Sequence, residues 1–119
     1  MLPDKVKVGA FWYGIRVASK EEEELLKAKG RQAECDYVKL EITLSPILTG
    51  MSQRESLLHE ILHANCRDRF MPGDTTSNEV DIYLTSMGLF QIMVDNPEVV
   101  RFIAGLGEPA AGPDPGRSS

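Results

Sequence analysis

The chain has 119 residues and a formal net charge of −5, with 42% hydrophobic and 26% charged residues. This length suits one small domain with its own hydrophobic core, and the composition is ordinary for a globular protein. The acidic balance and the scattered basic residues argue against a nucleic-acid partner, because neutralising phosphates requires clustered lysines and arginines. No apolar run is long enough to span a bilayer, so no membrane partner is expected.

The cysteine content and the first residues predict a compartment. Cys35 and Cys66 are too few for a disulfide scaffold, and reduced thiols are the simpler interpretation. The opening residues Met-Leu-Pro-Asp-Lys do not have the pattern of a signal peptide. We therefore expect a cytoplasmic protein.

Alternation of apolar and polar side chains predicts strands in the first half of the chain. Residues 6–10 and 11–17 alternate in this way, with a turn or bulge near Gly9. A weaker pattern covers residues 31–35. The clearest alternation runs over residues 38–44, and it predicts one continuous strand there.

Helix start signals follow the strands. Ser19 precedes a glutamate-rich segment, which predicts a short helix over residues 20–29 that stops at Gly30. Ser52 and Glu55 have the spacing of a capping box, in which the serine and the glutamate satisfy each other's backbone amides. We expect this box to open a long helix.

Two more helices are expected in the C-terminal half. After a loop at residues 70–75, a helix should run from residue 76 or 77 to Asp95. Asn96 is a good N-cap for a last helix that ends near residues 105–107. Residues 107–119 carry three prolines and three glycines with no apolar pattern, which predicts a disordered tail.

These elements predict an α+β fold in a single domain over residues 1–106. A small antiparallel sheet would form the N-terminal side, packed on three helices on the other side.

The segment His59-Glu60-Ile61-Leu62-His63 uses both histidines of the chain. Two imidazoles four residues apart on a helix lie about 40° apart around its axis, so both can reach one metal ion. Glu60 would flank that ion and take a proton from a bound water. On a helical wheel this motif forms a narrow polar sector of a mostly apolar helix, which favours a metal cleft over a surface helix with two unrelated histidines.

A catalytic metal needs a third protein ligand and one position left for water. Glu79 is the candidate, because it lies on the apolar face of its predicted helix, where an isolated carboxylate is costly unless a cation binds it. It also fits a capping box with Thr76, and then it would only cap the helix. Asp74 is the fallback ligand. Cys66 could supply a thiolate to structural zinc, although a buried core position is the commoner fate of a lone cysteine.

This set of residues resembles the minimal gluzincins, which are small zinc metallopeptidases that include phage-encoded peptidases and IrrE-like peptidases. The likeness lies in the segment Leu57–Ala64 around the histidine motif, in the downstream Glu79 at a helix start, and in the later Asp95-Asn96-Pro97-Glu98. It covers roughly residues 5 to 105, and only the histidine motif and Glu79 are specific.

The resemblance implies a zincin-like fold and one zinc ion held by His59, His63 and Glu79, with Glu60 as general base. The chain departs from larger gluzincins in one respect. Those enzymes often place an aspartate four residues after the ligand glutamate to orient a histidine, and here that position is Tyr83. The partner that orients the histidines is therefore unassigned.

The expected reaction is metal-assisted hydrolysis of a peptide bond in a protein or peptide substrate. Arg67 and Tyr83 are the candidate donors to the oxyanion, although each has a simpler structural role. Two other functions stay open: a metal-binding module that contacts a partner without catalysis, and a structural zinc domain with Cys66 as ligand. These ligand types also accept manganese, iron or cobalt.

Overall fold

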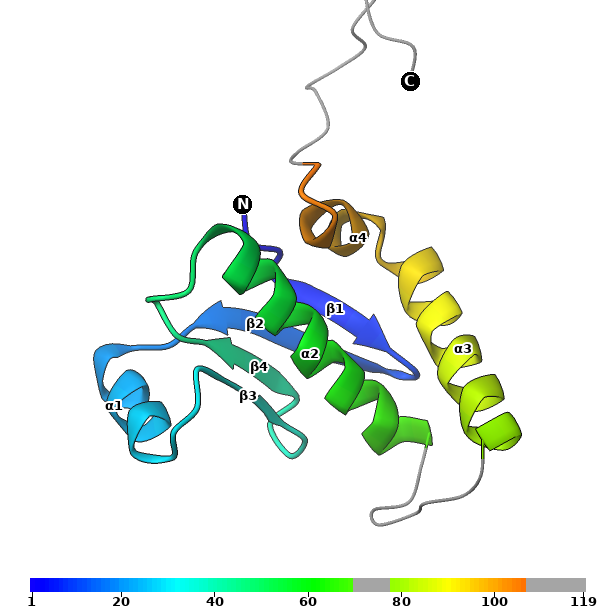
Figure 1. The fold of residues 1–119 in the computed structure, drawn as a ribbon, viewed down its shortest axis with the longest axis horizontal. Coiled ribbons are helices and arrows are strands. Elements are labelled where there is room, and N and C mark those ends of the chain that lie inside the picture. Colours follow the sequence, from blue (N-terminus) through cyan, green and yellow to red (C-terminus); the bar gives the residue numbers. More distant parts are fainter. Residues whose placement is uncertain (70–77, 107–119) are drawn as a thin grey trace, which may run out of the picture.

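The computed structural model describes the backbone of residues 1–69 and 78–106, and the side chains of residues 1–66 and 85–106 (Figure 1). The elements in chain order are β1 (Lys5–Val8), β2 (Phe11–Val17), α1 (Lys20–Ala28), β3 (Ala33–Asp36), β4 (Glu41–Leu44), α2 (Gly50–Arg69), α3 (Asn78–Asp95) and α4 (Pro97–Ile103). The loop expected at residues 70–75 and the tail expected at residues 107–119 lie outside the described residues.

The four strands form one sheet in the order β1-β2-β4-β3. β1 and β2 are an antiparallel hairpin joined by a tight turn, in which Gly9 has the positive φ of 61° that favours glycine. β3 and β4 are also antiparallel, but β2 and β4 run parallel. The α+β class is confirmed, whereas the prediction of a purely antiparallel sheet was wrong. The chain leaves β2 through α1, forms β3 at the far edge, and then returns between β2 and β3.

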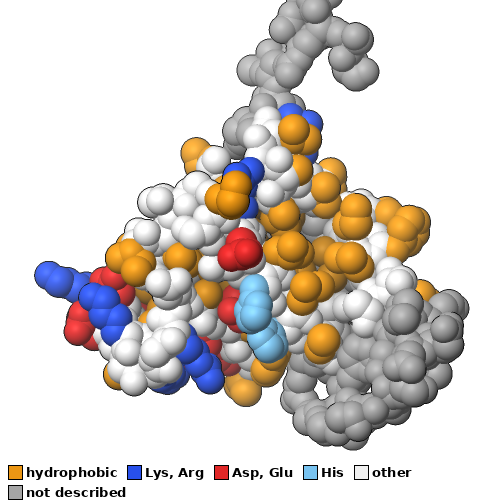
Figure 2. All heavy atoms as spheres, in the orientation of Figure 1, with side chains coloured by type: hydrophobic (Ala, Val, Ile, Leu, Met, Phe, Trp, Pro, Cys, Tyr) orange, Lys and Arg blue, Asp and Glu red, His pale blue; other side chains and the backbone are white. Residues whose placement is uncertain are grey.

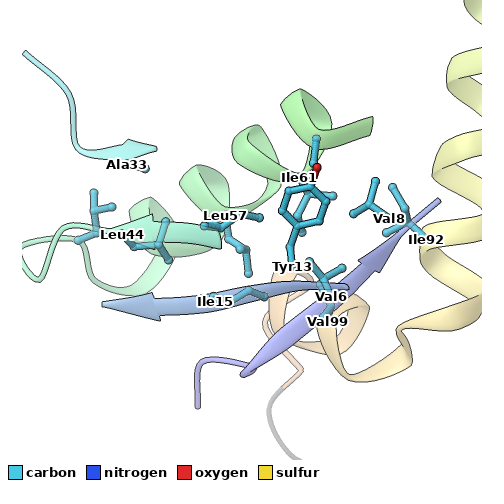
Figure 3. Close-up of a cluster of buried hydrophobic side chains, with 13 residues drawn as sticks. Val6, Val8, Tyr13, Ile15, Ala33, Leu44, Leu57, Ile61, Ile92 and Val99 are labelled. Carbon is cyan, nitrogen blue, oxygen red and sulfur yellow. The ribbon is translucent and has the colours of Figure 1, made fainter. Parts of the chain in front are cut away.

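One face of the sheet packs against helices. α2 crosses this face, α3 lies beside β1, and α4 contacts both α2 and α3 (Figure 1). These are the three helices expected to cover the sheet, and α1, at the opposite end from α3, is the fourth helix of the described part. A single core joins all these layers (Figure 3). Its members include Val6, Val8, Tyr13, Ile15, Ile42, Leu44, Leu57, Ile61, Ala64, Ile92 and Val99.

α1 begins as the sequence predicts. The Ser19 hydroxyl accepts a hydrogen bond from the Glu22 amide (3.2 Å), and the Glu22 carboxylate accepts one from the Ser19 amide (2.8 Å), so both halves of the capping box are present. Gly30 follows the helix with a φ of 69°, which suits a helix stop.

The strand expected over residues 38–44 is shorter than predicted. Residues 37–40 form a turn, and only Glu41–Leu44 are extended. The Asp36 carboxylate accepts hydrogen bonds from the amides of Val38 and Lys39, both at 2.9 Å, and this local bonding competes with strand pairing. Leu40 completes the reversal with a φ of 57°. The apolar alternation therefore continued into a hairpin turn, where Val38 is exposed.

α2 begins earlier than its predicted capping box. Its first residue is Gly50, so Ser52 lies inside the first turn and does not open the helix. The Ser52 hydroxyl accepts a hydrogen bond from the Thr49 amide (3.1 Å) and donates one to the Thr49 carbonyl (2.8 Å). The start of the helix is thus stabilised by a serine that reaches back to the preceding residue.

The expected cap of α4 has another role. Asn96 precedes the helix but makes no side-chain cap hydrogen bond. Its buried amide accepts from the Lys7 amide (2.8 Å) and donates to the carbonyls of Lys7 (2.9 Å) and Ile92 (2.8 Å). Gln91 of α3 accepts from the Gly9 amide at 2.8 Å. Two carboxamide side chains therefore bond to the backbone at the C-terminal end of β1, at Lys7 and at Gly9 in the turn that follows.

Candidate metal centre

The two histidines of α2 converge on one point. Their Nε2 atoms are 3.1 Å apart, and the rings meet edge to face with centroids 4.8 Å apart. With zinc–nitrogen bonds of about 2.0–2.1 Å, this separation corresponds to a ligand–metal–ligand angle of about 100°, which is close to tetrahedral. Both side chains are exposed, and Figure 2 shows them side by side at the surface with carboxylates next to them. The geometry of His59 and His63 thus fits a shared metal ion.

Glu60 has a different environment from its neighbours. It lies about 100° around the helix from His59, and it is 8% exposed. Burial raises the pKa of its carboxyl above the ordinary 4.5, and the nearby imidazoles of His63 and His59 oppose that shift. A carboxylate held at the base of the two histidines, in a partly desolvated position, is suited to exchanging a proton with a water between them.

A hollow of about 670 Å³ opens in front of these residues, between α2 and the edge of the sheet at β3. One wall carries His59, Glu60 and His63, together with residues one turn earlier on α2. The facing wall is the segment from Arg31 to Tyr37. The motif therefore lines an open trough at a strand edge.

The charges that line this hollow are mostly acidic. Glu34, Glu55 and Glu60 contribute carboxylates, and Arg31 is the single cation among its described lining residues. Arg31 pairs with Glu34 at 3.3 Å, and Lys29 reaches the same carboxylate at 2.9 Å. Without a bound cation the trough thus carries net negative charge, which favours binding of a positive ion.

The remaining predicted site residues fall where side chains are not described. Glu79 is the second residue of α3, but its side chain, like those of Arg67 and Tyr83, lies outside the described part, and Asp74 lies wholly outside it. Within the part that is described, no group of three histidine, cysteine or acidic side chains is arranged to hold a metal. α3 does run alongside α2, the helix that carries the histidines (Figure 1).

Cys66 does not have the buried position expected of it. It is exposed, because on the helical wheel it lies about 20° from His59 and so shares the exposed side of α2. Within the described part it does not form a three-ligand group with the two histidines.

Two residues that line the hollow were missed from the sequence. Cys35 belongs to β3 and Tyr37 to the turn after it, and both face the histidine wall across the hollow. Neither belongs to a motif, and both lie more than twenty residues before His59. Only the order of strands in the sheet brings them to the site.

Profiles of known protein families, curated proteins and solved structures were compared with this chain, and none matches it. The likeness to the minimal gluzincins therefore depends on the motif residues alone. None of the helices in the described part is long and apolar enough to cross a bilayer.

Proposed function

We propose that this protein is a zinc-dependent peptidase of the minimal gluzincin type, with a zincin-like fold. One observation carries the proposal: two Nε2 atoms lie 3.1 Å apart beside a buried carboxylate, in an open hollow at a strand edge. A surface helix with unrelated histidines would not need a buried Glu60 in the same hollow, since a lone buried carboxylate is costly. The cytoplasm remains the proposed compartment, on the sequence argument alone.

The proposed roles divide among four side chains. His59 and His63 hold the ion, and Glu79 from the first turn of α3 is the proposed third ligand. When bound, zinc would acidify a water molecule and polarise the scissile carbonyl. Glu60 accepts the proton of the attacking water and returns it to the leaving nitrogen, which is the role of a general base that then acts as an acid.

The two edges of the sheet support a peptide as substrate. Asn96 and Gln91 bond to the backbone of Lys7 in β1 and of Gly9 in the following turn, so part of that edge is occupied by side chains. β3 is the opposite edge, and its residues form one wall of the hollow. An extended peptide can add to such an edge through main-chain hydrogen bonds, and this would place one of its carbonyls over the histidines.

A metal and cleavage experiment tests the proposal. The purified protein should hold one zinc ion per chain by elemental analysis, and it should cleave members of a mixed peptide library followed by mass spectrometry. Glu60→Gln should lose cleavage by at least about a hundredfold, because general base catalysis contributes roughly that factor, and should keep its zinc.

Glu98→Gln is the control, since it removes an exposed carboxylate on α4 that does not line this hollow. It should cleave as the parent does. Equal cleavage by the parent and Glu60→Gln would contradict the proposed peptidase mechanism with Glu60 as general base. Zinc binding without cleavage by any variant would favour the non-catalytic module instead.

A further inference from the structure

The outer face of α3 is apolar and has no partner in the described part of the chain. From Ile82 to Val94 the helix has thirteen residues without a single charge. Met87 is 46% exposed, Phe90 71%, Met93 49% and Val94 61%. Figure 2 shows hydrophobic side chains gathered over this side of the molecule. A contiguous exposed apolar patch of this kind marks an interaction surface.

This patch is a face of the helix and not a scatter of side chains. At 100° per residue, Met87, Met93 and Val94 all fall within about 60° of Phe90. Gly88 and Ile92 point the opposite way and are buried, and Gln91 bonds to β1. α3 is therefore anchored to the sheet by one side, while the other side presents apolar groups to solvent.

Among the described side chains of α3, the exposed apolar residues Met87, Phe90, Met93 and Val94, together with exposed Ser86, are arranged symmetrically about Phe90. The others stand four and three residues before Phe90 and three and four after it, and the further exposed residue, Asp95, lies at the end of the helix. When two such helices pack antiparallel with a two-fold axis at Phe90, Met87 meets Met93 of the second copy and Ser86 meets Val94. An isologous contact requires this kind of self-complementary patch.

We propose that this face binds a second copy of the chain, and that the two α3 helices pack antiparallel across a two-fold axis near Phe90. Its neutrality lets two chains with a net charge of −5 each approach without charge repulsion at the contact. Asp95, which follows Val94 at the end of α3, pairs with Lys7 of its own chain at 3.9 Å. The acidic net charge also disfavours an anionic membrane surface as the occupant.

The area of the patch limits how tightly two copies of the chain can associate. Four partly exposed side chains supply on the order of 400 Å² per copy, whereas a standard stable interface buries about 800 Å² per partner. The dimer should therefore be weak, and its population should depend on protein concentration. The hollow lies between α2 and β3, so the contact leaves it open and does not depend on the proposed peptidase activity.

Sedimentation of the full chain over a concentration series tests the proposal. The parent should shift from monomer to dimer, and Phe90→Glu should weaken association at least about tenfold, because it buries a charge at the axis. Leu25→Glu is the control, since Leu25 is 63% exposed on α1, away from this face. A parent that stays monomeric up to several hundred micromolar, or a Phe90→Glu variant that dimerises as the parent does, would overturn the proposal.

Cross-linking tests the register and does not depend on how well Phe90→Glu folds. Under mild oxidation with copper–phenanthroline, Phe90→Cys should link to itself, because its side chain sits at the axis. Met87→Cys should link poorly to itself but well to Met93→Cys when the two variants are mixed. The linked peptides are identified by mass spectrometry, which separates them from links through the native Cys35 and Cys66. Preferential self-linking of Met87→Cys would contradict the antiparallel arrangement.

Discussion

Adjacent residues of α2 have opposite environments, and the proposed chemistry depends on this contrast. His59 is exposed and Glu60 is buried, although one peptide bond joins them. A helix turns by about 100° per residue, so one side chain faces solvent while the next faces the body of the protein. The imidazoles can therefore accept an ion from solution, whereas the carboxylate behind them is partly desolvated.

At the same scale, a substitution can distinguish the two possible roles of Glu79, which are metal ligand and helix cap. Glu79→Gln keeps a side-chain oxygen that can accept the capping-box hydrogen bond, but it replaces the charged carboxylate ligand by a neutral amide. If Glu79 is a ligand, this variant should bind zinc at least about tenfold more weakly in a competition titration with a chelator. Asp81→Asn, two residues further along α3, should bind zinc as the parent does. Unchanged affinity in Glu79→Gln would assign the residue to the cap.

Asn65 is a second residue whose environment predicts a measurable effect. Its side chain is fully buried on α2, and among the described residues neither its Nδ2 nor its Oδ1 atom has a hydrogen-bond partner. A buried polar group without a partner costs about 1–3 kcal/mol. Asn65→Leu, similar in size and apolar, should therefore raise the free energy of unfolding by about 1 kcal/mol or more in urea denaturation. Asn65→Asp should lower it, since it buries a charge.

At the scale of elements, α1 is tied to the sheet by one guanidinium. Arg16 of β2 forms a bidentate pair with Glu22 of α1, with one contact at 2.6 Å, and it also contacts Glu41 of β4 at 3.3 Å. The two carboxylates raise the pKa of Arg16 further above its ordinary value. The pKa of Glu22 falls from 4.5 to about 2, mainly because Arg16 donates hydrogen bonds to its carboxylate, and the Ser19 amide adds to this effect.

This shift predicts a pH dependence. Because the folded-state pKa of Glu22 is depressed, its charged form stabilises the fold above about pH 4.5, and that contribution is lost as the pH falls toward 2. Glu22→Gln keeps the capping box but loses the ion pair. Its melting temperature should lie below that of the parent at pH 7, and the gap should narrow between pH 5 and pH 3. Glu21→Gln, in the same helix turn, is the control and should show no such convergence.

At the scale of the whole molecule, Asn96 joins the two ends of the described chain. It bonds to Lys7, which is 89 residues away in the sequence, and so connects the start of α4 to the first strand. Removing it would also uncover the edge of β1, and uncovered edges promote aggregation.

Asn96→Ala should lower the free energy of unfolding by about 2–3 kcal/mol, because it deletes three hydrogen bonds and removes the acceptor of the Lys7 amide, whereas the Lys7 carbonyl keeps its hydrogen bond from Gln91 (3.2 Å). Asn96→Asp keeps the acceptor for the Lys7 amide, but it loses both donors and buries a charge. The free energy of unfolding should therefore fall by at least as much as in Asn96→Ala. Urea denaturation measures both variants, and amide hydrogen exchange at Lys7 should accelerate in Asn96→Ala. A change below about 0.5 kcal/mol in Asn96→Ala would contradict this role.

Local patterns were sufficient for much of the fold. The β1–β2 hairpin, α1 with its Ser19 cap, and the helix that carries the histidines follow from alternation, capping residues and helical periodicity, which act over a few neighbouring residues. The convergence of His59 and His63 has the same origin, because a spacing of four on a helix brings two side chains together whatever the rest of the chain does.

Other features required the chain to be folded. The alternation of apolar and polar residues in β4 is the same whether the neighbouring strand runs parallel or antiparallel. The path of the chain, which returns between β2 and β3, decided that β4 runs parallel to β2. Asparagine is a typical helix-capping residue, but the side-chain amide of Asn96 instead forms hydrogen bonds with the backbone of Lys7 in β1. Tyr37 lines the same hollow as the histidines only because of the order of strands in the sheet. Short-range geometry is encoded in residue spacing, whereas pairings between distant segments depend on which packing buries the shared core, and only the tertiary structure decided them.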